Sequence, residues 1–104
     1  MTKATAKSTI THPVSRREMK IDTETHRRFK DAILRSLRGS PGKTFTQLTD
    51  DVVKTIRKEW PQFKGSIQWY TISVRLDLES RGVVETFTEK GKKWNRLRSM
   101  ARKR

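Results

Sequence analysis

The chain has 104 residues, of which 25 are Lys or Arg and 11 are Asp or Glu, giving a formal net charge of +14. A chain of this length favours one domain with one modest core, which the three Trp and four Phe can help to form. The lack of Cys excludes disulfides and thiolate metal sites, and no apolar run approaches the roughly 18 residues that span a bilayer. These features disfavour a secreted scaffold, a membrane protein and a large enzyme, and they predict a cytoplasmic protein.

The positive charge is concentrated at the two ends of the chain. Residues 1–21 contain five basic residues and one acidic residue, residues 83–104 contain eight and two, and residues 22–82 contain twelve and eight. A stable core does not require this distribution, whereas a polyanionic partner would explain it. The alternative is that basic tails only keep the protein soluble.

The first part of the chain is predicted to be an arm followed by a helix. Residues 1–21 are poor in bulky apolar residues, which predicts a disordered basic arm. A helix is predicted from Asp22 to Gly39, with Asp22 or Thr23 as its N-cap and Gly39 closing its end. Its apolar stripe has helical spacing and consists of Phe29, Ala32, Ile33 and Leu37.

Two more helices and a hairpin are predicted to follow. The second helix comes after a short extended piece at 43–45, with Thr46 as its expected N-cap, and Pro61 ends it. Ser66 is expected to cap a third helix that ends at Gly82. The remaining elements are a strand at 83–88, a turn at 89–92 and a returning strand at 93–98. The predicted organisation is therefore an arm (1–21), one domain (22–98) and a basic tail (99–104).

Three short helices followed by a hairpin rich in Lys and Arg resemble the winged helix-turn-helix superfamily. More narrowly, the segments GSIQWY at 65–70 and VRLDLESRGVVE at 74–85 are similar to an uncharacterised family of small bacterial winged-helix proteins. The resemblance implies a mainly α fold with a small β-hairpin. In that fold the third helix enters a DNA major groove and the hairpin, or wing, contacts backbone phosphates. The family brings no established activity.

The third helix is predicted to have two apolar faces. The inner face, which should pack on the other helices, consists of Ile67, Tyr70, Thr71, Val74 and Leu78. The outer face carries Trp69, Ile72 and Leu76. Base edges are read mainly by Arg, Asn, Gln and Lys, so Gln68 and Arg75 are the candidates for base contacts on this helix.

The outer apolar face itself favours a protein interface or a covering segment. That cover could be a second copy of the chain, or arm residues drawn from Ile10, Val14, Met19 and Ile21. Contact of Trp69, Ile72 and Leu76 with thymine methyl groups or bases is the less favoured alternative.

The predicted hairpin supplies the main candidates for contacts with DNA phosphates, which are Lys90, Lys92, Lys93, Arg96 and Arg98. Beside them, Trp94 is expected to pack beneath the wing with Phe87. An aromatic ring next to basic groups could instead stack on a base.

No catalytic or metal-binding arrangement is apparent. The segment 42–44 ends like a phosphate-binding loop but lacks the glycine that opens that motif. Asp50 and Asp51 are adjacent, so their side chains diverge around a helix. His12 and His26 lack the spacing of metal ligands. We therefore expect no enzyme activity, no metal and no cofactor, and the sequence gives no indication of a small-molecule ligand.

The sequence predicts a small DNA-binding transcriptional regulator or DNA-associated factor. Its partner would be double-stranded DNA, no membrane would be involved, and the protein would be associated with the nucleoid. The alternative is a protein-interaction or homodimerisation module that uses Trp69, Ile72 and Leu76. Both functions could coexist if that face formed a dimer and the wings held DNA.

Overall fold

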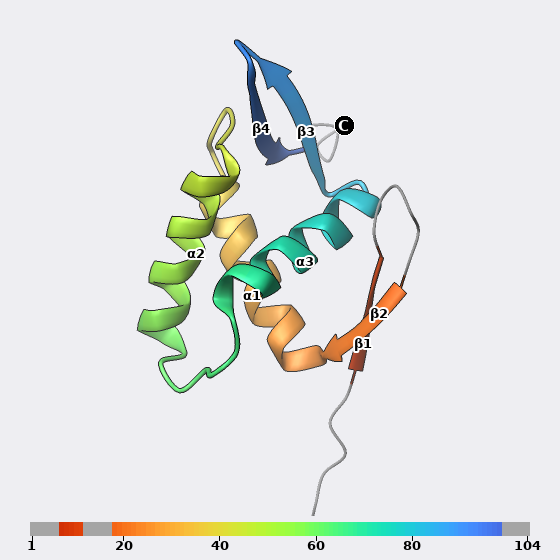
Figure 1. Cartoon of the computed structure of the whole chain (residues 1–104), viewed down its shortest axis with the longest axis vertical. Coiled ribbons are helices and arrows are strands. Elements are labelled where there is room, and N and C mark those ends of the chain that lie inside the picture. The colour runs from red at the N-terminus through yellow and green to blue at the C-terminus, as the bar shows by residue number, and fades with distance from the viewer. Residues whose placement is uncertain (1–6, 12–17, 99–104) are drawn as a thin grey trace, which may run out of the picture.

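A computed structural model describes residues 7–11 and 18–98, and the side chains from Ile21 to Arg98. Three helices lie between two antiparallel hairpins (Figure 1). The elements, in chain order, are β1 (Lys7–Thr11), β2 (Glu18–Asp22), α1 (Thr23–Leu37), α2 (Phe45–Glu59), α3 (Ile67–Ser80), β3 (Val84–Glu89) and β4 (Lys92–Leu97). The expected mainly helical fold with a C-terminal hairpin is confirmed.

The hydrophobic core lies where the three helices meet. Its helical members recur at spacings of three and four residues, which places them on one face of each helix. They are Phe29, Ala32, Ile33 and Leu37 from α1, Leu48, Val52 and Ile56 from α2, and Val74 and Leu78 from α3. Ile67 and Tyr70 pack at the edge of this core, so the inner face predicted for the third helix is confirmed.

Polar side chains cap the start of each helix. Asp22 accepts a hydrogen bond from the Thr25 backbone N–H at 3.0 Å, and Ser66 accepts one from the Trp69 N–H at 3.1 Å, as predicted. The expected cap of the second helix, Thr46, is wrong. Thr44 caps α2 and forms a reciprocal capping box with Gln47. The Thr44 hydroxyl accepts a hydrogen bond from the Gln47 backbone N–H, and the Gln47 side chain accepts one from the Thr44 backbone N–H.

The C-terminal hairpin is a tight wing attached to the helical body. β3 pairs with β4 from Val84 opposite Leu97 to Glu89 opposite Lys92. The two turn residues, Lys90 and Gly91, have φ angles of 55° and 78°, as a two-residue type I′ turn requires. The turn therefore fixes the register of the lysines at the tip.

A third extended segment ties the wing to the start of α2. The backbones of Lys43 and Asn95 exchange hydrogen bonds of 2.8 and 2.7 Å. Three helices, this short bridge and the wing together make the arrangement of a winged helix-turn-helix domain, so the predicted fold class is confirmed.

The expectation of a disordered arm over residues 1–21 is wrong for the segments that the structure describes there. Residues 7–11 pair in antiparallel register with residues 18–22, and β1 runs beside α3 (Figure 1). Composition suggested disorder because it ignores pairing, which satisfies the backbone polar groups. Ile21 also joins the core at 5% exposure. Residues 1–6 and 12–17, the tail at 99–104, and the side chains of Ile10, Val14 and Met19 lie outside the described part.

Candidate nucleic-acid interface

The wing carries three exposed lysines at and beside its tip. Lys90, Lys92 and Lys93 are all exposed, and none forms an ion pair with a described residue. Alternation along β4 places Lys93 on the same face of the wing as Asn95, whereas Lys92 lies on the face of Trp94. Unpaired ammonium groups on a rigid turn are free to contact phosphate groups.

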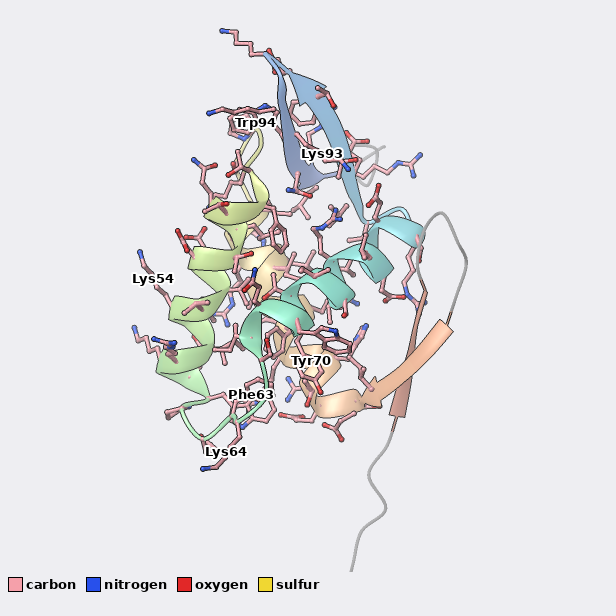
Figure 2. The ribbon with its side chains drawn as sticks, viewed as in Figure 1. Lys54, Phe63, Lys64, Tyr70, Lys93 and Trp94 are labelled. Atoms are coloured by element: carbon pink, nitrogen blue, oxygen red, sulfur yellow. The ribbon has the colours of Figure 1, made fainter. Side chains whose placement is uncertain are left out.

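Lys93 lies over the outer surface of α3. A shallow pocket of about 190 Å³ lies between the start of α2, α3 and β4, and it is lined by Phe45, Ile72, Arg75, Lys93 and Asn95. Because Ile72 and Lys93 line the same hollow, the wing lysine and the exposed face of α3 belong to one continuous surface. Figure 2 labels Lys93 on the wing, which projects above the helices.

The exposed part of α3 is its N-terminal half. Trp69 is 42% exposed and Ile72 is 37% exposed, and the neighbouring Gln68 is also exposed. Trp69 is held by an edge-to-face contact with Tyr70, with ring centroids 4.8 Å apart. The third predicted member of this face, Leu76, is only half-exposed, so the apolar surface is smaller than expected.

Arg75 is engaged within the fold, contrary to the expectation that it contacts bases. Only 11% of its side chain is exposed, and Nη1 donates hydrogen bonds to Glu79 at 3.2 Å and to Asn95 Oδ1 at 3.0 Å. Asn95 in turn donates from Nδ2 to the Lys43 carbonyl at 3.1 Å. Arg75 therefore joins α3 to the wing and forms the polar floor of the pocket.

The two arginines of the wing are also in contact with the protein. Arg96 donates from Nε to Glu85 at 2.5 Å, and its guanidinium lies 4.4 Å from the centre of the Phe87 ring. Arg98 lies against Gly82, where a Cβ atom would come within 2.8 Å of its guanidinium. These contacts make Arg96 and Arg98 weaker candidates for phosphate contacts than the three lysines.

A second group of unpaired cations was not singled out from the sequence. It consists of Lys54, Arg57 and Lys58 on α2 and Lys64 in the following loop. The spacing of three and four residues on α2 was the available signal. Figure 2 shows Lys54 projecting from α2 and Lys64 at the end of the molecule opposite the wing, so they do not extend the surface formed by Lys93 and Ile72.

Several carboxylates in the body are neutralised by neighbouring cations. Hydrogen bonds from Arg27 and Arg28 lower the pKa of Glu24, and a hydrogen bond from Arg35 lowers the pKa of Glu59. Hydrogen bonds from Lys43 and then Ser36 lower the pKa of Asp51. The cations in these contacts serve the fold, whereas Lys90, Lys92 and Lys93 of the wing are exposed and available to an anion.

The described residues form neither a metal-binding cluster nor a membrane-spanning helix. No cluster of three His, Asp or Glu side chains there could hold a metal ion. None of the helices in the described ranges combines the length and hydrophobicity needed to cross a membrane.

The chain belongs to a family of unknown function, DUF6958, whose model matches residues 7–94. The match includes the N-terminal hairpin, the three helices, β3 and the first half of β4. No curated protein and no solved structure matches the chain.

Proposed function

We propose that this member of the DUF6958 family binds double-stranded DNA and acts as a small transcriptional regulator or nucleoid-associated factor. The wing lysines would contact phosphates while the N-terminal half of α3 lies in the major groove. The observation that carries the proposal is the position of Lys93 beside Ile72 on one surface. The wing lysine that would contact a phosphate therefore lies next to the exposed face of α3, and that face would contact the bases.

The charge of the molecule supports the same partner. The net charge of +14 raises the local concentration of a polyanion and speeds encounter with it. Each lysine that neutralises a phosphate releases a counterion, which contributes about −0.9 to the slope of log affinity against log salt concentration. Binding through the wing is therefore expected to be steeply salt-dependent.

The test compares two double variants that lose equal charge at different places. Lys92→Gln with Lys93→Gln removes two wing cations, and Lys54→Gln with Lys58→Gln removes two exposed cations from α2. Binding of the full chain to a random duplex is measured by fluorescence anisotropy between about 50 and 200 mM salt. The wing variant is expected to bind more weakly and to flatten the salt slope by about one for each lysine.

The α2 variant should keep most of the wild-type affinity and slope. Equal loss in both variants would mean that only net charge attracts DNA, and it would contradict a docked wing. An unchanged affinity in the wing variant, or absence of binding by the wild-type protein, would refute the proposed interface.

A protein interface on α3 is the second candidate function. It is favoured by the exposure of Trp69 and Ile72, which are the exposed large hydrophobic side chains of the described chain. Such adjacent apolar side chains are common at subunit contacts. Sedimentation of the wild-type protein and of Trp69→Ser tests this candidate, which requires an oligomer that the substitution dissociates.

A further inference from the structure

We propose that the exposed face of α3 recognises the 5-methyl groups of thymine, so that the protein prefers A·T-rich DNA. This inference rests on the proposed DNA-binding function and adds the chemical feature that is read. The inference is based on the exposed side chains of Trp69 and Ile72 and on Gln68, which is exposed on the same half of the helix.

The outer face of α3 carries exposed apolar side chains at positions where a helix that reads bases commonly carries hydrogen-bonding side chains. The side chain that could have supplied a strong donor, Arg75, is held by Glu79 and Asn95. The exposed side chains that remain on the N-terminal half include an indole and a branched aliphatic group. Burying such groups against hydrogen-bonding base edges would leave those edges unpaired, which costs free energy.

The major groove contains one apolar group, the C5 methyl of thymine, which distinguishes A·T from G·C by contact alone. The same base pair presents N7 and the N6 amino group of adenine, which a glutamine amide matches with two hydrogen bonds. Gln68 next to Trp69 therefore complements both bases of one pair or of neighbouring pairs.

The position of these side chains suits groove contact. N-terminal residues of a recognition helix reach base edges in helix-turn-helix complexes, and Gln68, Trp69 and Ile72 occupy the first half of α3. Ile72 shares its pocket with Lys93, so a phosphate held by the wing would bring the adjacent groove towards Ile72. The lysines fit a polyanion, and they would not favour an uncharged apolar partner on the same surface.

The experiment compares duplexes that differ only in the methyl group. Binding of the full chain is measured to an A·T-rich duplex and to the same duplex with deoxyuridine in place of thymidine, which keeps every base pair and phosphate. Loss of the methyl groups should weaken binding by about four-fold for each one contacted, the ratio that corresponds to burial of one methyl group. In a G·C duplex, 5-methylcytosine in place of cytosine should strengthen binding.

Variants locate the effect on α3. Ile72→Ser should reduce the ratio of thymidine to deoxyuridine affinity, and Ile72→Val should keep it. The double substitution of Lys92 and Lys93 by Gln should weaken both duplexes equally and leave the ratio unchanged, because phosphates carry no base information. If Ile72→Ser fails to fold, the wild-type comparison still tests methyl recognition, and Trp69→Ser then tests whether the effect lies on α3.

The outcomes separate this inference from the function on which it rests. Salt-dependent binding with equal affinity for the two duplexes would overturn methyl recognition and leave DNA binding intact. A methyl effect that neither Ile72→Ser nor Trp69→Ser reduces would also overturn it. Absence of binding to every duplex would overturn the proposed function, and the inference with it.

Discussion

Asp77 is a fully buried carboxylate that links two helices. His26 Nε2 on α1 lies 3.2 Å from its Oδ2 atom, and Arg81 Nε donates to the same oxygen at 2.8 Å. A carboxylate removed from water is tolerated only when such partners satisfy it. The aspartate in the segment VRLDLESRGVVE is therefore explained by the packing of α3 on α1.

Replacing Asp77 with Ala should destabilise the protein strongly. The change leaves His26, which is only 14% exposed, without its carboxylate partner, and it removes the acceptor of Arg81. Loss of a partner by a buried polar group costs about 1–3 kcal/mol, so the melting temperature should fall by at least about 4 °C for a domain of this size. Thermal unfolding followed by circular dichroism checks this, with Asp50→Ala as the control because Asp50 is exposed. Similar melting temperatures for the two variants would contradict the role of Asp77.

Gln68 and Arg75 show what a helical pattern can predict for a single residue. Both were candidates for base contact because their chemistry suits it and neither lies at the centre of the inner face. Arg75 differs from Gln68 because it pairs with Glu79, four residues later on α3, and donates a hydrogen bond to Asn95, twenty positions later in the sequence. A contact between α3 and β4 depends on how the wing folds back, and the spacing of residues within α3 contains no information about it.

A small network of polar side chains joins helices α1 and α2. Asp51 on α2 accepts a hydrogen bond from Ser36 on α1 at 2.6 Å, and Lys43, in the segment that pairs with the wing, forms an ion pair with the same carboxylate. The hydrogen bond from Lys43, followed by that from Ser36, lowers the pKa of Asp51 below its ordinary value of 3.8. The ionised form therefore stabilises the folded state.

Asp51→Asn should lower stability at pH 7, and its effect should depend on pH in a defined direction. Because the folded pKa is depressed, the stabilisation by Asp51 is fully present above its unfolded pKa and is lost as pH falls through the folded value. The free-energy difference between wild type and Asp51→Asn should thus stay constant from pH 7 to about pH 5 and shrink below about pH 4. Urea unfolding at several pH values measures it.

The comparison between the two proteins cancels the effects of other acids, such as Glu24 and Glu59, whose pKa values are also lowered. A difference that persists undiminished well below pH 4, or that grows there, would contradict a stabilising ionised Asp51.

The elements were predictable to different degrees from the sequence. Asp22 and Ser66 marked helix starts because capping is local, and the apolar stripes marked the buried faces for the same reason. The pairing of β1 with β2 joins residues 7–11 to 18–22 and depends on contacts with the helices. Neither strand shows a hydrophobic run strong enough to reveal that pairing, so composition alone predicted disorder.

The fold of the whole molecule was more predictable than its site. Three capped helices and a hairpin have few compact arrangements, and the order of elements was sufficient to predict the winged helix. The site required knowledge of which cations are neutralised. Five cations across 21–98 pair with an acid three or four residues away, a spacing that the sequence does show, and they are Arg27, Arg28, Arg35, Arg75 and Arg81. The pairs of Lys43 with Asp51 and of Arg96 with Glu85, and the second pair of Arg35 with Glu59, join different elements, and sequence position does not reveal them.

The central claim is that the wing and the first half of α3 form one DNA-binding surface. The most direct measurement follows the backbone amide signals of the labelled full chain by nuclear magnetic resonance during titration with a short duplex. We predict that the largest shifts fall in two segments, 66–73 and 88–95, while the exposed side of α2 around Lys54 and Lys58 changes little. Shifts concentrated on α2 or at the chain ends, with none on the wing and α3, would contradict the account.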